Sequence, residues 1–307
     1  MYSMKKLTIY TFSLLVAALC TSCGEEALSP ESVIIDYKSE PNEFDLWLLE
    51  NYVKPYNIDL VYRADDKQYS LDHTLAPPDY AHSIAVAKLL QHLWLGTYND
   101  VKGIIFTKTY IPKVIVLVGS GMFNSTSVTV GEAEGGMKIT FARINDLDLE
   151  NLTITDLTGM STYAGNGTES TGMIKTAYHE FAHIMTQTKP LPEEFSLITP
   201  TEYLDDDWNA SGTTPLLAWT SGFPSKYSKH SPGEDFAEIV SIYVTRGSAN
   251  WDELLTAAGT EGAEILDAKV ASINKYLKNS WSTSLDAMRD AFEARAAQLD
   301  DLDLENL

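Results

Sequence analysis

The sequence predicts an α+β protein in which a small mixed sheet packs on helices. Apolar residues recur at helical spacing over residues 80–95, and runs rich in β-branched residues follow between residues 103 and 142, separated by glycine-rich breaks. Helical patterns resume at residue 171 and dominate the rest of the chain. Because the strands are grouped before the helices rather than alternating with them, we expect α+β rather than α/β topology.

The N-terminal segment predicts export and lipidation. Lys5 and Lys6 precede an apolar stretch over residues 7–19, which is too short to span a bilayer comfortably and is typical of a signal peptide. Small residues then lead to Cys23, an arrangement that resembles the cleavage site of bacterial lipoproteins. We expect removal of residues 1–22 and a lipid anchor on Cys23; an ordinary secretory peptide cut nearby is the alternative.

The remainder of the chain has the composition of an acidic, disulfide-free domain. Residues 23–35 form a polar tether and residues 36–307 a single domain. Both cysteines, Cys20 and Cys23, lie before that domain, and a chain of this length can bury a sizeable core without a disulfide. The formal net charge is −21, and loss of the two leader lysines makes it −23. This charge argues against nucleic-acid or anionic-lipid binding.

Within the domain, periodicity predicts the elements in order. Residues 43–56 form a short amphipathic helix ending near Pro55, residues 59–62 a brief strand, and residues 80–95 a longer helix. The sheet is expected from residues 103–107, 113–119 and 137–142. Helices are expected over residues 171–187 and 232–245, with two more within residues 250–299. The α/β part therefore extends to about residue 165, and the part after it is helical.

The stretch TAYHEFAHIM places His179, Glu180 and His183 in the order H-E-x-x-H. Residues four apart share one face of a helix, so both imidazoles can point at one metal ion. Glu180 lies about 100° around the helix from His179, where it can reach a water on the metal without ligating the metal. The spacing suits hydrolysis in which zinc acidifies water and a carboxylate takes the proton. An amphipathic helix with exposed histidines is the weaker alternative.

A catalytic zinc ion needs a third protein ligand, and the chain lacks a third histidine at the extended H-E-x-x-H spacing. Carboxylates are the candidates: Glu202 in a polar loop, and Glu234, Asp235 or Glu238 at the start of a helix. A packed helix holds a ligand better than a loop does. Ser231 is the expected N-cap, and its spacing to Glu234 also fits a capping box. The residues alone favour Glu234 only slightly over Glu238 as the third metal ligand.

A resemblance to a known family supplies further roles. The HEFAH motif followed by Tyr227, Glu234 and Glu238, in the pattern Y-x6-E-x-x-A/F-E, resembles the lethal-factor-like branch of the gluzincins. That resemblance implies that Glu234 is the third ligand and that Glu238 supports the ligands from behind. It also implies that Tyr227 donates a hydrogen bond to the oxyanion or leaving group. His230 is a rival for that role, since other gluzincins use histidine there.

More closely, the chain resembles the zinc-binding metallopeptidase lipoproteins of Bacteroidetes, the substrate import-associated zinc metallohydrolase lipoproteins. The segments YNIDLVYRADD, LAPPDYAHSIAVAKLLQHLWLGTY, HEFAH and SPGEDFAEIVSIYV carry the likeness, which covers most of residues 30–250. It implies a zincin-like fold with one zinc ion per chain. It also implies an outer-membrane lipoprotein, with importer components as possible partners. Glu25 and Glu26, after the lipidated cysteine, resemble surface-export signals.

The leading hypothesis is a cell-surface zinc peptidase that acts on peptide or protein substrates, with Glu180 as general base. By analogy with zincin folds, the strand over residues 137–142 is expected to offer its edge to an extended peptide. A hypothesis from a different class is a non-catalytic substrate-binding lipoprotein of a nutrient-import system. A third is metal-dependent hydrolysis of another amide or of an ester, which zinc, base and tyrosine would serve equally well.

Overall fold

The computed structural model describes residues 40–63, 75–123, 128–129, 131–134 and 136–307. The chain divides into two units, Met1–Pro41 and Asn42–Leu307, and nearly all of the described residues belong to the second. The leader, the lipidation site at Cys23 and the tether predicted over residues 23–35 lie outside the described residues. No helix in the described part combines the length and the apolar character that crossing a membrane would take.

The described chain begins with a helix that runs through α2 (Glu43–Leu48), a π-helical turn, and α3 (Lys54–Tyr56). The Asn42 side chain accepts a hydrogen bond from Asp45 N, and Asp45 accepts one from Asn42 N. This reciprocal capping satisfies backbone donors that the first turn would otherwise leave unpaired. Asn57, in the left-handed conformation with φ 56°, ends the helix. The helix predicted over residues 43–56 is confirmed.

A four-stranded mixed sheet has the order β1-β2-β6-β5. Three of its strands run parallel, β1 (Asp59–Val61), β2 (Val114–Leu117) and β6 (Lys138–Phe141), and β5 (Gly131–Glu134) pairs antiparallel with β6. The predicted α+β fold with a small mixed sheet is therefore confirmed. The expectation that the strand over residues 137–142 forms an edge is wrong, because β6 is paired on both sides and β5 forms that edge instead.

The strand predicted over residues 103–107 is instead the helix α6 (Ile104–Tyr110). Gly103, with φ 77°, separates it from α5 (Gly96–Lys102). The Phe106 ring stacks on Tyr98 at 5.9 Å and meets Phe181 edge-on at 6.1 Å. These aromatic contacts stabilise a short helix although its β-branched residues favour strand, because packing outweighs a local propensity of a few tenths of a kcal/mol.

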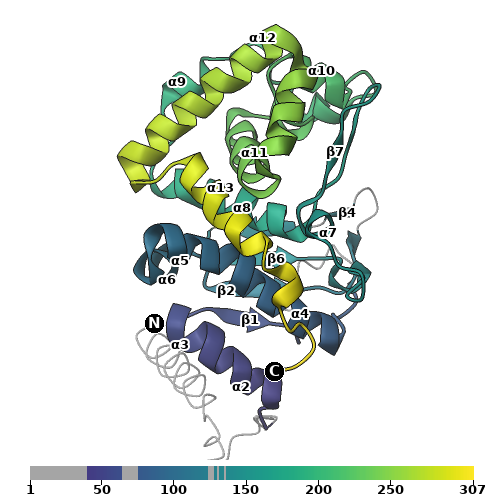
Figure 1. Cartoon of the computed structure of the whole chain (residues 1–307), viewed down its shortest axis with the longest axis vertical. Helices are drawn as coiled ribbons and strands as arrows, with labels where there is room; N and C mark the ends of the chain where they lie inside the picture. The colour runs from purple at the N-terminus through teal and green to yellow at the C-terminus, as the bar shows by residue number, and fades with distance from the viewer. Residues whose placement is uncertain (1–39, 64–74, 124–127, 130, 135) are drawn as a thin grey trace, which may run out of the picture. The chain divides into compact units, whose positions relative to one another are not determined.

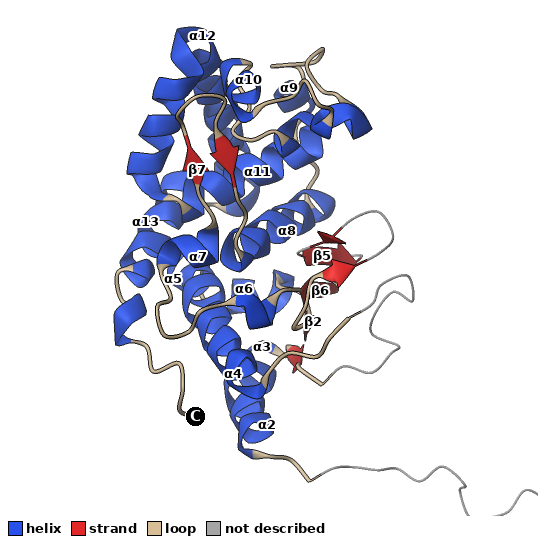
Figure 2. Ribbon diagram, turned by 90° about the vertical axis from the view of Figure 1, so that its right-hand side faces the viewer, coloured by secondary structure: helices blue, strands red, loops and turns tan. Residues whose placement is uncertain are grey.

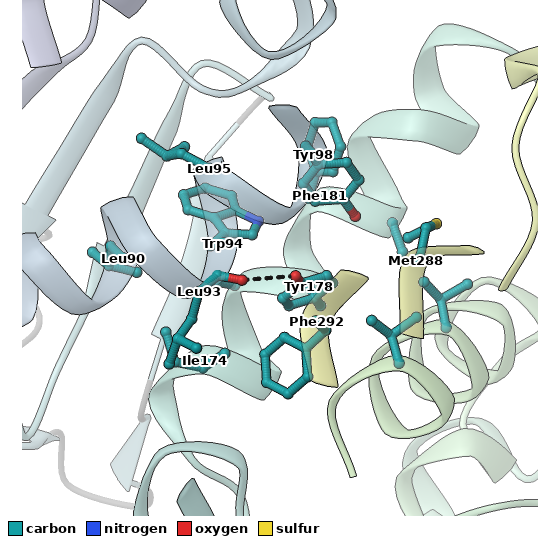
Figure 3. Packing of buried hydrophobic residues seen from close by; sticks show 14 of the residues in the cluster. Leu90, Leu93, Trp94, Leu95, Tyr98, Ile174, Tyr178, Phe181, Met288 and Phe292 are labelled. Carbon is teal, nitrogen blue, oxygen red and sulfur yellow. Dashed lines mark hydrogen bonds between the residues drawn. The ribbon is translucent and has the colours of Figure 1, made fainter. Parts of the chain in front are cut away.

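Helix α8 (Met173–Thr188) carries the H-E-x-x-H motif and is anchored between the sheet and the helix made by α4 (Tyr80–Leu89) and η3 (Leu90–Leu95). Trp94 lies between Phe141 of β6 and Phe181 of α8, with ring centroids 6.3 and 6.4 Å away. The Tyr178 hydroxyl donates to the Leu93 carbonyl at 2.9 Å (Figure 3). Such packing fixes the rotation of α8 about its axis and hence where its polar face points.

The C-terminal part is helical. Helix α11 (Pro232–Thr245) packs along α8, and α13 (Leu285–Ala296) packs on α11 (Figure 1). Helix α12 (Gly247–Tyr276) kinks at Gly259, where φ is 70°. In Figure 2, α8 lies beside β5 and β6, with α11 and α12 on its other side. The remaining elements are short: η4 (Ile144–Asp146), α7 (Ile154–Thr158), α9 (Glu193–Ser196), η5 (Asp205–Asn209), α10 (Pro215–Thr220), η6 (Tyr227–Lys229), η7 (Leu277–Trp281), η8 (Leu299–Asp301), and the two-stranded pairs β3 (Met122–Phe123) with β4 (Val128–Thr129) and β7 (Ser161–Thr162) with β8 (Thr168–Glu169).

Candidate metal centre

The polar face of α8 meets the first turn of α11, and three side chains from the two helices converge there. The Nε2 atoms of His179 and His183 lie 3.1 Å apart. Glu234 Oε2 lies 3.0 Å from the first and 3.2 Å from the second. Within the described part of the chain, this is the one group of three histidine, cysteine or acidic side chains close enough to share a metal ion.

The three atoms fit a tetrahedral zinc ion in both spacing and chemistry. Zinc bonds of about 2.0–2.1 Å at tetrahedral angles separate the ligand atoms by about 3.3–3.4 Å, close to the observed 3.0–3.2 Å. Two imidazoles and one carboxylate are also a donor set that catalytic zinc accepts, with a fourth position left for water or substrate. His183 and Glu234 remain 21% and 18% exposed, which leaves that fourth side open.

Helix capping explains why Glu234 is free to face the histidines. Ser231 caps α11 by accepting a hydrogen bond from Glu234 N at 3.3 Å, and Pro232 occupies the first turn. The Glu234 carboxylate does not return a bond to the Ser231 backbone, so the capping box that the spacing allowed is half formed. Its side chain bonds the two imidazoles instead.

Glu238 lies behind His179 rather than among the converging atoms. Its Oε1 is 2.8 Å from His179 Nδ1, an ion-pair distance without the alignment of a good hydrogen bond. The same carboxylate forms an ion pair with Lys175 and accepts a hydrogen bond from Ser225 Oγ at 2.6 Å. A carboxylate on the far nitrogen of a histidine fixes the tautomer and orientation that a metal ligand needs.

Charges around His179 prepare the site for a cation. Burial lowers the pKa of His179, but its contacts with Glu234 and Glu238 outweigh burial and raise the pKa to about 9. Burial raises the pKa of Glu234, but the two imidazoles outweigh burial and hold it well below its usual range. The metal-free site therefore holds a proton at neutral pH, and a metal ion must displace that proton when it binds.

Two comparisons with known proteins indicate a zinc-binding family. Residues 37–286 match the model of the family described as "Putative zinc-binding metallo-peptidase". The chain belongs to this family. The structure also matches, with a TM-score of 0.71 and 35% sequence identity, a crystal structure titled "putative zinc-binding metallo-peptidase" from Bacteroides caccae. That match covers 87% of this chain and 98% of the other. Among curated proteins, none matches the chain.

Two further residues stand beside the converging atoms. Burial raises the pKa of Glu180, and the neighbouring His179 and His183 offset only part of that rise. The Tyr227 ring lies 5.8 Å from the His179 ring. Burial, together with the charge of Glu234 and a hydrogen bond with it, raises the pKa of Tyr227, so its hydroxyl stays protonated at neutral pH.

The structure separates the remaining candidates from the centre. His230 packs against Tyr227, with ring centroids 5.9 Å apart, and its Nε2 lies 3.6 Å from Asp206 at the surface. Glu202 is half exposed and lies 3.5 Å from Lys229. Asp235 points away from the histidines and forms an ion pair with Lys269 at 2.7 Å. None of these three side chains belongs to the converging group.

Sequence reasoning did not identify Lys175 or Ser225, the two partners that hold Glu238. Lys175 lies four residues before His179, so both share one face of α8. A lysine on the same buried helical face as the motif was the available signal, because a buried lysine requires a buried partner. Ser225 lies in an irregular segment, where no periodicity indicated its position.

Proposed function

We propose that this chain is a zinc-dependent peptidase whose active site is the face shared by α8 and α11. The observation that carries the proposal is the triangle of His179, His183 and Glu234, whose three atoms have the spacing of zinc ligands. These residues would hold one zinc ion per chain. Bound there, zinc supplies a Lewis acid that polarises the scissile carbonyl and acidifies water.

Glu180 is the general base of this proposal. It follows the first histidine on α8, and its raised pKa brings it nearer the range in which a carboxylate both takes and returns a proton. It takes a proton from the attacking water and delivers it to the leaving amine. Burial of the carboxylate is the cause of this raised pKa.

Tyr227 is the electrophilic partner. Its hydroxyl keeps its proton at neutral pH and donates a hydrogen bond to the carbonyl oxygen as negative charge develops there. Packing of Trp208 against the ring, with centroids 4.9 Å apart, supports this position. Tyr227 is favoured over His230 because its ring contacts a metal-ligand histidine, whereas His230 contacts Tyr227 and Asp206.

The substrate in this proposal is an extended peptide paired with β5. Support comes from the position of this strand, which forms one edge of the sheet and contacts α8, the helix that carries His179 and His183. The edge of β6 cannot serve, since β2 and β5 occupy both its sides.

We also propose that Cys23 carries a lipid that anchors the enzyme in the outer membrane with the domain at the cell surface, where importer components would be its partners. Support comes from the leader pattern over residues 1–22 and the acidic residues after Cys23. Labelling with a clickable fatty acid should mark the wild type and leave Cys23→Ser unmarked. Proteolysis of intact cells then tells where the domain lies. A domain at the cell surface is cleaved, and a domain on the periplasmic face is protected.

Glu180→Gln tests the catalytic proposal directly. With zinc loaded, wild type should cleave a mixed peptide library, a chelator should abolish cleavage, and zinc should restore it. Glu180→Gln should bind the same amount of zinc but cleave at least about 100-fold more slowly, the range seen when a positioned proton acceptor is lost. Equal cleavage by both proteins would falsify the role of Glu180. Tight peptide or glycan binding without cleavage would favour the binding-lipoprotein alternative.

Elemental analysis tests the ligand set separately. Near one zinc per chain is expected in the wild type, with zinc lost from Glu234→Ala and largely retained by Glu238→Ala. Loss of zinc from Glu238→Ala, with zinc retained by Glu234→Ala, would mean that Glu238 rather than Glu234 is the third ligand.

A further inference from the structure

A cavity of about 410 Å³ adjoins the metal centre, and its wall carries five charged side chains. The cations are Lys175, Lys226 and Arg246, and the carboxylates are Glu169 and Glu238. Three cations and two carboxylates leave the wall with a net charge of +1, whereas the whole chain has a net charge of −21. A local excess of positive charge on so acidic a protein favours an anionic guest.

The cavity shares Tyr227 with the proposed active site. Tyr227 lines the cavity, and its ring lies 5.8 Å from the ring of His179. None of the proposed metal ligands lines the cavity, so a guest there would leave the ligand triangle intact. The cavity is large enough for an amino-acid side chain, since ligand pockets typically begin at about 300 Å³. A peptide with its scissile carbonyl at the metal centre would therefore have a residue close to that bond within reach of the cavity.

Four of the five charges in the wall compensate one another. Lys175 forms an ion pair with Glu238, with side chains 6% and 3% exposed. Burial raises the pKa of Glu169, while a hydrogen bond from Lys226 N and the charge of Arg246 act in the opposite direction. Arg246 is therefore close enough to Glu169 for their opposite charges to offset each other. Together these four side chains present no net charge to a guest.

Lys226 supplies the charge that remains. Its Nζ donates a hydrogen bond to Asn209 Oδ1 at 2.8 Å and lies 5.9 Å from the centre of the Trp208 ring, which also lines the cavity. Within the described part of the chain, no carboxylate lies at ion-pair distance from this Nζ. The side chain is half-buried and its bond to Asn209 is exposed, so its two other N–H donors are available to a guest. The exposed acidic residues 205–207 precede Trp208 but do not line the cavity.

We propose, on the basis of the peptidase function above, that this cavity is a specificity pocket for a substrate carboxylate close to the scissile bond, with Lys226 as its charge partner. The carboxylate is that of a glutamate or aspartate side chain, or the C-terminal carboxylate of a peptide that is cut near its end. Lys226 Nζ donates to it, and the rings of Trp208 and Tyr227 pack against the aliphatic part of the same residue. A basic side chain is rejected, because it would meet an unpaired cation.

Lys226→Glu tests this assignment by reversing the spare charge. The hydrogen bond to Glu169 comes from the backbone N of Lys226, so the substitution leaves that bond in place. Cleavage of a proteome-derived peptide library, read by mass spectrometry, should show glutamate, aspartate or the peptide C-terminus enriched about fivefold or more close to the bond cut by wild type. In Lys226→Glu this enrichment should disappear, and lysine or arginine should be favoured at the same position.

Two further variants keep the test decisive. Lys275→Glu makes the same change of charge at an exposed position on α12, and it should keep the wild-type preference. Asn209→Asp changes an exposed side chain to one of nearly the same shape, and it places a carboxylate where Lys226 Nζ now donates. The acidic preference should therefore fall in Asn209→Asp as well, and this variant decides the matter if Lys226→Glu does not fold.

Peptide binding and C-terminal amidation sharpen the result. The affinity of zinc-loaded Glu180→Gln for matched glutamate, glutamine and lysine peptides is a readout independent of cleavage. The glutamate peptide should bind most tightly, and its advantage should shrink as the salt concentration rises. A preference that is lost when the peptide C-terminus is amidated assigns the pocket to the terminal carboxylate, and one that persists assigns it to a side chain.

The outcomes separate this inference from the peptidase function. Cleavage with no preference for a carboxylate, or with a preference unchanged in both Lys226→Glu and Asn209→Asp, overturns the pocket and leaves the peptidase intact. A basic preference in the wild type also overturns it. If zinc-loaded wild type cleaves no peptide, the peptidase function itself fails, and the pocket assignment fails with it.

Discussion

Helix α11 carries two buried ion pairs three residues apart, and they differ in what surrounds them. The metal-side pair joins Lys175 and Glu238, with side chains 6% and 3% exposed. The distal pair joins Lys269 and Asp235, with both side chains 0% exposed. Burial disfavours the charge on both carboxylates, yet the pKa of Glu238 is held well below its usual range while that of Asp235 is raised to about 6.

The number of partners accounts for the difference. Burial is the largest influence on Glu238, but the charges of Lys175 and His179 and their hydrogen bonds outweigh it. Ser225 Oγ donates to its second oxygen at 2.6 Å. Asp235 receives Lys269 and the Tyr203 hydroxyl on one oxygen, and its Oδ1 has no partner among the described residues. A fully paired carboxylate therefore keeps its charge to a lower pH than a half-paired one does.

This contrast suggests a division of labour along one helix. The metal-side pair keeps a negative charge behind His179, where it favours a cation at the proposed zinc site. The distal pair ties α11 to α12: Lys269 also donates to Gly222 O at 2.8 Å, and its Nζ lies 3.5 Å from the centre of the Phe223 ring. We therefore expect changes to the distal pair to affect stability alone, and changes to the metal-side pair to affect zinc as well.

The largest effect is expected from Lys269→Met. It leaves the Asp235 carboxylate fully buried with the Tyr203 hydroxyl as its remaining donor. Removing one partner of a buried ion pair costs about 3–5 kcal/mol, so urea denaturation should show a fall of that size in the free energy of unfolding. Lys275→Met, at an exposed position on the same helix, should change it by less than about 0.5 kcal/mol. Similar free energies of unfolding for the two variants would show that the distal pair does not stabilise the fold.

Lys175→Met should cost less, about 2–3 kcal/mol, because Ser225 and His179 still compensate Glu238. It also removes a cation close to the proposed zinc site, so zinc should raise the melting temperature of this variant more than that of wild type. The zinc-induced shift in Lys269→Met should equal that of wild type. Equal zinc-induced shifts in melting temperature for wild type, Lys175→Met and Lys269→Met would contradict the expectation that only the metal-side pair affects zinc binding.

Zinc affinity provides a further test of the contrast. Glu238→Gln weakens the carboxylate contact behind His179, and changes of this kind typically cost 10- to 100-fold in metal affinity. Asp235→Asn should change zinc affinity by less than about threefold, since Asp235 does not contact the converging atoms. Competition against a chromogenic chelator measures both values. A comparable loss in the two variants would show that Glu238 acts through the fold rather than through His179.

The sequence predicted the parts of this site that depend on local spacing. His179, Glu180 and His183 followed from helical periodicity, and the start of α11 followed from Ser231 and Pro232. What local spacing did not supply was the packing that brings the two helices together. The pairing within the two ion pairs could not be predicted, because Lys269 and Asp235 are 34 positions apart, Lys175 and Glu238 are 63 apart, and no local rule pairs them. Strand β5 was also missed: its residues, GEAE, include no β-branched or aromatic side chain, and pairing with β6 alone defines it.

The smallest expected effect, and the most specific, is a pair of opposite pH dependences in the metal-free protein. The pKa of Asp235 rises from 3.8 to about 6 on folding, so its contribution to stability is full below 3.8 and is lost as pH rises through 6. The pKa of Glu238 falls from 4.5, so its contribution is present above 4.5 and is lost as pH falls. Relative to wild type, the penalty of Asp235→Asn should therefore shrink by about 2 kcal/mol between about pH 4 and pH 7. The penalty of Glu238→Gln should instead be full at neutral pH and shrink only below about pH 4.5. Urea denaturation in chelator across this range measures both, and penalties that change in the same direction would mean that the partners of the two carboxylates do not set their charge.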